Sequence, residues 1–128
     1  MTRKTSSSPN APKAIGPYSQ AVWTGNLLYC SGQTPIDPET GKLVEGGISE
    51  QTRQAFRNLE SVLSGAGLNM NQVIKVNVYL TSMANFAEMN TVYQDRFTAP
   101  YPARTTVAVA ALPLNAMVEI ELIAERSE

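Results

Sequence analysis

The feature of this sequence that most constrains its fold is the alternation of apolar and polar side chains along residues 73–80. Successive side chains of a β-strand point to opposite faces, so this alternation predicts a half-buried strand. The apolar positions are Ile74, Val76, Val78 and Leu80, and the positions between them are Lys75, Asn77 and Tyr79. The chain is therefore expected to build a sheet around this strand.

Two helices are predicted, one before and one after this strand. In the first, apolar residues recur at helical spacing after Ser49, which is the predicted N-cap, and the helix is expected to stop at Gly65 or Gly67. The second is predicted over 85–97, where apolar side chains form one stripe. We expect both helices to pack on a sheet.

Four further strands follow from β-rich composition between turn signals. Leu43-Val44 offers only a short additional strand, and the predicted strands cover 18–24, 27–31, 105–110 and 117–124. The order ββ(β)αβαββ predicts an α+β fold, with a mixed sheet of about six strands and two helices on one face. At 128 residues, we expect a single domain that spans 1–128.

The other face of the predicted sheet has no element to cover it. Its side chains are of mixed character and too apolar to remain entirely in water. They are Lys75, Asn77, Tyr79, Met117, Glu119, Glu121 and Ile123. The sequence therefore predicts that this face packs against another subunit.

The chain contains no histidine and one cysteine, Cys30. This excludes Ser-His-Asp and Cys-His catalysis and a histidine-rich zinc site within one chain, and we expect no metal site. A lone cysteine cannot form an internal disulfide, so Cys30 is expected to be a small buried hydrophobe in a reducing, cytoplasmic setting. Any chemistry must use arginine, carboxylates, hydroxyls, lysine or backbone groups.

The charge pattern does not favour a nucleic-acid partner. The net charge is −1, and the ten basic residues are scattered rather than gathered on one predicted face. No apolar run approaches the roughly 18 residues of a membrane span, so we expect no membrane partner. Residues 1–13 are basic and serine-rich without an apolar stretch, and they are expected to be a flexible tail.

Arg104 is the best candidate anchor for an anionic ligand. It opens the predicted strand over 105–110, and Thr106 shares its face because side chains alternate. A guanidinium carries a fixed fork of donors that matches a carboxylate or phosphate and stays protonated at any working pH. The alternative, a solvated or salt-bridged arginine at a strand edge, is equally compatible with these residues.

Glu119 and Glu121 place two carboxylates on one face of the last predicted strand. They would lie about 7 Å apart, and partial burial would raise the pKa of either one, which suits proton transfer. A solvated or ion-paired strand edge is the alternative for each glutamate.

Weaker signals come from polar residues at turns and on the second helix. Tyr18 follows a Gly-Pro turn and could reach into a cleft or simply pack, and Ser31-Gly32 ends a strand where a ligand could approach the backbone. Asn90 lies beside the apolar stripe of the second helix, where it is either exposed or engaged in a specific hydrogen bond.

Together these residues form a family pattern. The runs Pro102-Ala103-Arg104, Thr106-Val107 and Glu119-Ile120-Glu121 strongly resemble the Rid family, the YjgF-type reactive intermediate deaminases that act on imines and enamines. Three further runs also match, namely residues 15–20, 31–33 and 66–68. The resemblance covers the chain from about Ala11 onward.

The resemblance implies a chorismate-mutase-like fold assembled as a homotrimer, with ligand clefts between neighbouring subunits. It implies hydrolysis of 2-iminobutanoate, 2-iminopropanoate and enamines such as 2-aminoacrylate, which pyridoxal-phosphate enzymes release. The products are 2-keto acids and ammonia, and the protein itself needs no cofactor. A protonated imine is already electrophilic, so an anchor, a positioned water and one titratable group would suffice.

The resemblance also implies roles for individual residues. Arg104 would clamp the substrate carboxylate, and Glu119 would handle protons or orient the attacking water. The other residues that would line the cleft are Tyr18, which we also place among the catalytic groups, and Ser31, Gly32, Asn90 and Thr106. Many relatives carry cysteine where this chain has Thr106, so a role that depends on a thiol is lost here.

Two other functions stay open at this point. One is a non-catalytic trimeric protein that binds small carboxylates or 2-keto acids with the same arginine. The other is an endoribonuclease-type translation inhibitor, against which the missing histidine and basic patch count. The sequence leaves open the preferred imino acid side chain, and whether Tyr18 and Arg104 of one cleft come from one subunit or two.

Overall fold

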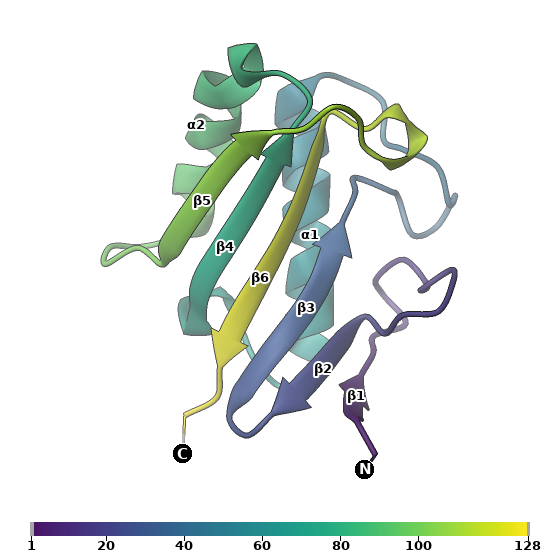
Figure 1. Cartoon of the computed structure of the whole chain (residues 1–128), viewed down its shortest axis with the longest axis vertical. Helices are drawn as coiled ribbons and strands as arrows, with labels where there is room; N and C mark the ends of the chain where they lie inside the picture. The colour runs from purple at the N-terminus through teal and green to yellow at the C-terminus, as the bar shows by residue number, and fades with distance from the viewer. Residues whose placement is uncertain (1, 128) are drawn as a thin grey trace.

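The computed structural model describes residues 2–127, which form a six-stranded sheet and two α-helices (Figure 1). The strands are β1 (Lys4–Ser6), β2 (Ala21–Thr24), β3 (Leu27–Gln33), β4 (Val73–Leu80), β5 (Ala103–Ala108) and β6 (Val118–Glu125). The helices are α1 (Ile48–Gly65) and α2 (Phe86–Arg96), and the short 3-10 helices are η1 (Met70–Gln72), η2 (Met83–Asn85) and η3 (Pro113–Asn115).

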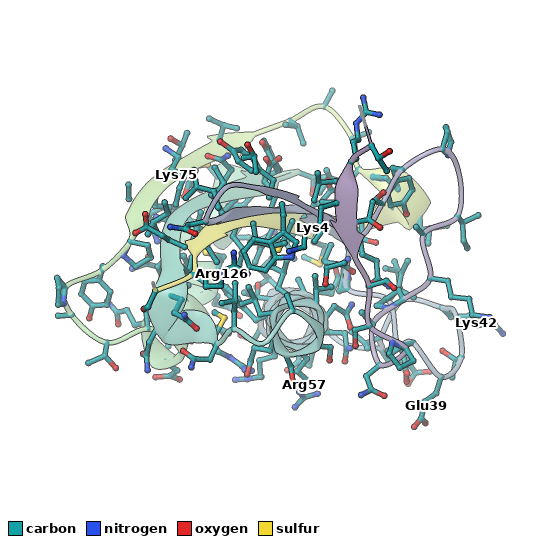
Figure 2. All side chains as sticks on the ribbon, turned by 90° about the horizontal axis from the view of Figure 1, so that it is seen from below. Lys4, Glu39, Lys42, Arg57, Lys75 and Arg126 are labelled. Atoms are coloured by element: carbon teal, nitrogen blue, oxygen red, sulfur yellow. The ribbon has the colours of Figure 1, made fainter. Side chains whose placement is uncertain are left out.

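The strands lie in the order β1-β2-β3-β6-β4-β5, and all neighbouring pairs are antiparallel except β4 and β5. The parallel pair is connected through α2, the crossover that parallel strands require. Both helices cover one face of the sheet, the rear face in Figure 1. Arg57 of α1 and Lys75 of β4 accordingly lie on opposite sides of the sheet in Figure 2. The predicted α+β class, with two helices on one face of a mixed sheet, is confirmed.

The core fills the space between the helices and the covered face of the sheet. The helical spacing of α1 and the alternation of β4 and β6 deliver their apolar side chains to this space. The fully buried residues include Phe56, Leu59, Val76, Val78 and Ile120. Phe56 also meets Tyr93 of α2 edge to face, with 5.8 Å between ring centroids, so that the two helices are fixed against each other.

The start of α1 differs from the prediction. The helix begins at Ile48 with Gly47 as its N-cap, and the Gly47 N–H donates to Glu50 Oε1 at 2.8 Å. The predicted N-cap, Ser49, is wrong because its hydroxyl lies inside the first turn and donates to Glu88 Oε2 of α2. The predicted end at Gly65 is confirmed.

The bounds of β4 match the prediction, but one side chain does not follow the alternation. The register between β4 and β6 shifts between Val73 and Lys75. This irregularity turns Ile74, expected on the core face, outward to 42% exposure, and Val73 is buried instead. From Val76 onward the alternation holds.

The expectation that residues 1–13 form a flexible tail is wrong for the described part of that segment. Lys4–Ser6 pairs with β2 as β1, and Ala11 is 2% exposed. The buried side chain of Gln20 fastens the segment, because it accepts from the Ser8 N–H at 2.7 Å and donates to the Pro12 carbonyl oxygen at 2.9 Å. Met1 lies outside the described residues.

Other boundaries shift by a few residues. The strand predicted over 18–24 is shorter, the strands that begin near residues 105 and 117 are displaced, and Leu43 forms only an isolated bridge with Ile36. In the described part of the chain, no helix combines the length and the apolar character that crossing a membrane requires.

Candidate active site

Strand register decides on which face each candidate side chain lies. Arg104 pairs with Val76 and Thr106 pairs with Val78, and both valines point into the core. Paired residues of neighbouring strands share a face, so Arg104 and Thr106 lie together on the helix-covered face, at the sheet edge formed by β5. The predicted sharing of a face by these two residues is confirmed.

The Arg104 guanidinium is held by α2. Its Nη1 donates to Asn90 Oδ1 at 2.6 Å, and its Cζ lies 4.6 Å from the ring centroid of Tyr93 and 5.5 Å from that of Phe86. Within residues 2–127 the ion pairs join Arg53 to Glu50 and Arg96 to Glu60, and none involves Arg104. The salt-bridged alternative for Arg104 is therefore excluded within the described chain.

The guanidinium opens onto a hollow of about 380 Å³. An arginine can only donate, so Asn90 must present its amide oxygen to it and leave its NH₂ group free. The residues that line the hollow are Asn90, Tyr93, Gln94, Tyr101, Pro102 and Arg104. This excess of donors around a fixed positive charge suits a carboxylate.

Two buried hydroxyls lack hydrogen-bond partners among the described residues, one lining this hollow and one on the sheet face that carries Arg104. They are Tyr93 Oη and Thr106 Oγ1. Burial raises the pKa of Tyr93, with the charge of Arg104 opposing, so the phenol stays protonated near neutral pH. Buried polar atoms nearly always have a partner, so these two hydroxyls mark this surface as one that a ligand or a second copy would complete.

Glu119 lies on the opposite, open face of the sheet. It pairs with Tyr79 and borders a second hollow of about 650 Å³, which Tyr18, Ser31 and Gly32 also line. Burial raises the pKa of the Glu119 carboxyl, and the charge of Glu121 raises it further. Glu119 is thus suited to take up and release protons.

Gly32 is required for this position of Glu119. A Cβ at residue 32 would lie 2.3 Å from Glu119 Oε2, a distance that real Cβ contacts do not show. The β3–β6 pairing is irregular between Cys30 and Gln33, which is where Ser31 and Gly32 meet the hollow. The backbone of β3 and the Glu119 carboxylate therefore approach each other because residue 32 has no side chain.

The hydroxyls of Ser31 and Tyr18, which were also predicted for the site, differ in whether they can donate a hydrogen bond to a ligand. The Ser31 hydroxyl donates to the Ser19 carbonyl oxygen at 2.6 Å, so it is left only as an acceptor. The Tyr18 side chain is 52% exposed, and its hydroxyl accepts from the Ile15 N–H at 3.4 Å. Its proton is therefore available to a ligand in the hollow.

The candidate residues form two groups that do not meet within one chain. Arg104, Asn90 and Thr106 lie on the helix-covered face, whereas Glu119 lies on the open face with Tyr18. An arginine and a glutamate on opposite faces of one sheet cannot hold the same small ligand. A site that uses both needs two copies of the chain.

Sequence reasoning did not identify three aromatic residues beside these groups. Tyr93 and Phe86 flank the guanidinium, and Tyr79 bonds Glu121. The apolar stripe of the second helix contained Tyr93 and Phe86, but only the β4–β5 register shows that Arg104 reaches that stripe. Among residues 2–127, no group of three or more histidine, cysteine, aspartate or glutamate side chains is placed to hold a metal ion.

Known proteins match both the sequence and the fold. A family model described as Endoribonuclease L-PSP matches residues 8–126. A RutC family protein of Pyrococcus horikoshii is 53% identical over 115 residues, which cover 90% of this chain and 91% of that protein. A 2-iminobutanoate/2-iminopropanoate deaminase of Mus musculus is 47% identical over 124 residues, covering 97% of this chain and 92% of that protein.

The likeness extends to three dimensions. A Rid family protein of unknown function from Yersinia pestis has a crystal structure that superposes with a TM-score of 0.94 at 45% identity, covering 98% of this chain and 100% of that one. The chorismate-mutase-like fold that the resemblance implied is thereby confirmed. With a family model that matches nearly its whole length and relatives near half identity, the chain belongs to the Rid family.

Proposed function

We propose that this protein is a hydrolase that deaminates 2-imino acids, such as 2-iminobutanoate and 2-iminopropanoate, to 2-keto acids and ammonia. The observation that carries the proposal is the Arg104 guanidinium, which has no carboxylate partner among residues 2–127 and opens with Asn90 onto a donor-rich hollow. A small 2-imino acid offers one permanent anionic group, its carboxylate, and such an anchor would orient it. The name of the Mus musculus relative supports the same class of substrate.

The working assembly in this proposal is a homotrimer with its sites between subunits. Arg104 and Glu119 lie on opposite faces of one sheet, so one substrate would take its anchor from one copy and its proton carrier from a neighbour. The open sheet face, which Lys75 and Tyr79 share with Glu119, would be covered by the same contact.

The reaction needs one water and one proton carrier. The ionised Glu119 carboxylate takes a proton as the water oxygen bonds to the C=N carbon of the protonated imine, which gives a carbinolamine. Glu119 passes that proton to nitrogen and accepts the hydroxyl proton as the C–N bond breaks and the C=O bond forms. It then gives this second proton to the departing ammonia, so that ammonium leaves and Glu119 is ionised again. A carboxyl whose pKa is raised by burial can serve in both directions near neutral pH.

The other residues of the site support this chemistry. The Tyr18 hydroxyl and the backbone at Ser31-Gly32 would line the reacting end of the cleft, and Asn90 would fix the guanidinium. Thr106 Oγ1, buried without a partner among the described residues, would complete the cleft where many relatives carry cysteine. No step requires a thiol.

The test couples a serine or threonine dehydratase to the purified protein and follows decay of the released 2-imino acid. Wild type is expected to accelerate the decay above the spontaneous rate, and Arg104→Ala is expected to abolish the acceleration while the assembly stays intact. Arg57→Ala, which removes an exposed arginine on the outer side of α1, is the matched control and should retain wild-type activity. Full activity in Arg104→Ala would show that the proposed anchor is wrong.

One observation favours a second candidate, a protein that binds small carboxylates without turning them over. The Arg104 hollow is formed by side chains of one chain, and no carboxylate that could act as a base is among the described residues that line it. Titration calorimetry with 2-oxobutanoate separates the two candidates. Binding that is lost in Arg104→Ala, together with no acceleration by wild type, would favour the binding protein.

A further inference from the structure

Two carboxylates border the hollow on the open face, and they differ in their partners. The Tyr79 hydroxyl donates to Glu121 Oε1 at 2.7 Å. No side chain or backbone N–H among residues 2–127 donates to Glu119, which lines the same hollow. Glu121 is thus held in place, and the Glu119 carboxylate is free to meet water or substrate.

The register shows that this choice of partner is specific. Tyr79 lies directly opposite Glu119 in the β4–β6 ladder, and Asn77 lies opposite Glu121. The Tyr79 side chain passes its direct neighbour and reaches the diagonal one, a distance that a long aromatic side chain can span. A phenol has one proton to donate, so its bond to Glu121 leaves none for Glu119.

Neither carboxylate forms an ion pair among residues 2–127. The titratable and charged side chains that face them are Lys75 and Tyr79 from β4, Tyr29 from β3, and Lys13 and Tyr18 from the segment before β2. Cys30 also lines the hollow, and Glu125 lies further along the same face of β6. The Lys75 ammonium donates to Thr105 Oγ1 of β5 at 3.2 Å, toward the far edge of the sheet.

The charges follow from these contacts. The hydrogen bond to Glu121, burial and the nearby carboxylates raise the pKa of Tyr79 to about 12, so its hydroxyl keeps its proton and continues to donate. Glu121 accepts the hydrogen bond that this hydroxyl donates, and two residues along one strand separate its carboxylate from that of Glu119 by about 7 Å. At that distance a like charge favours the protonated form of its neighbour.

We infer that Glu121 is a positioning residue for the proposed reaction: anchored by the Tyr79 hydroxyl, it holds a fixed negative charge beside Glu119 and makes Glu119 the carboxyl that exchanges protons with water and substrate. This inference rests on the proposed function. It separates the two glutamates of the strand by role, since Glu119 exchanges protons and Glu121 is held beside it by Tyr79.

The first test is the pH profile of kcat for imine hydrolysis. The limb of the pH profile that disappears in Glu119→Gln is assigned to titration of Glu119. In Glu121→Gln we expect the midpoint of this limb to move to lower pH, because the negative charge beside Glu119 has been removed. KM should stay near wild type, since Arg104 of a neighbouring copy supplies the anchor. Glu121→Asp keeps the charge and should restore most of the limb's position.

Glu125→Gln is the matched control, because it removes a carboxylate from the exposed end of the same strand. Its profile should match wild type. If Glu121→Gln does not fold, Tyr79→Phe serves instead, because loss of the anchor lets the Glu121 side chain turn away. It should then move the Glu119 limb in the same direction by a smaller amount.

The second test does not depend on turnover. In protein labelled with ¹³C-glutamate, the Glu119 carboxyl carbon is assigned by its absence in Glu119→Gln and titrated by NMR. Its midpoint should fall in Glu121→Gln and, less, in Tyr79→Phe. If the Glu119 midpoint shifts in Glu121→Gln but the wild-type protein has no deaminase activity, the proposed function alone is overturned. If the wild-type protein is active but Glu121→Gln moves neither the limb of the pH profile nor the NMR midpoint, this inference is overturned.

Discussion

Gly32→Ala isolates the geometry of the proposed proton carrier. The added Cβ would lie 2.3 Å from Glu119 Oε2, 3.0 Å from Cδ and 3.2 Å from Cγ. Ordinary van der Waals contact begins near 3.4 Å, so the carboxylate must retreat by about 1 Å. The atoms to be moved belong to the end of a flexible side chain, so Glu119 rather than the β3 backbone is expected to yield.

The expected consequence is a selective loss of turnover. Because a misplacement of about 1 Å can cost a catalytic group up to about 100-fold, we expect kcat for imine hydrolysis to fall by about 10- to 100-fold. Binding of 2-oxobutanoate should change little, because the anchor is Arg104 of a neighbouring copy, and the hydrogen bond that Arg104 makes with Asn90 does not involve residue 32. The free energy of unfolding should change by less than about 1 kcal/mol, because residue 32 does not have the positive φ that only glycine tolerates.

The assay is the coupled dehydratase reaction, run beside thermal denaturation of each variant. Gly47→Ala is the control glycine substitution, because the nearest atom to its Cβ, in Glu50, lies at 3.8 Å, and neither residue lines the hollow. A double-mutant cycle with Glu119→Gln tests the route of the effect. The reasoning is refuted if a folded Gly32→Ala keeps wild-type kcat, or if it lowers kcat equally in the Glu119→Gln background.

Three further predictions follow from the contacts around Arg104 and from the core. Asn90→Ala removes the amide that fixes the guanidinium, and the loss of about 1 kcal/mol of hydrogen bonding should raise KM by about 5-fold with a smaller effect on kcat. Tyr93→Phe deletes a buried hydroxyl without a partner in the described chain, so thermal denaturation should show equal or higher stability. Phe56→Ala empties the fully buried position where α1 meets α2, and urea unfolding should show a loss of about 3–5 kcal/mol, whereas a loss below about 1 kcal/mol would contradict this packing.

The sequence by itself determined the elements whose pattern is local. The alternation over 73–80 predicted a strand with the observed bounds, and the helical spacing after Ser49 predicted α1 to within two residues at its start. Alternation also showed that Arg104 shares a face with Thr106, and that Glu119 shares one with Glu121. These features depend only on the period of a helix or strand, which neighbouring residues in the chain reveal.

Features that depend on pairing between distant segments were not visible in the sequence. Lys4–Ser6 has no apolar alternation and becomes a strand because β2 accepts it, with Gln20 holding the segment that follows. Ile74 leaves the core face because the β4–β6 register shifts. A strand edge or a bulge exists only relative to its partner strand, so local composition carries no signal for either.

The tertiary structure also decided how the candidate site is divided. Alternation shows which side chains of one strand share a face, but it does not show which face the helices cover. The parallel β4–β5 register brings Arg104 under α2, beside Asn90 and Tyr93, and the antiparallel β4–β6 register leaves Glu119 on the open face. The sequence showed that Arg104 and Glu119 have suitable chemistry. Only the pairing of distant strands determines which face of the sheet each side chain occupies, and this pairing places the two residues on opposite faces.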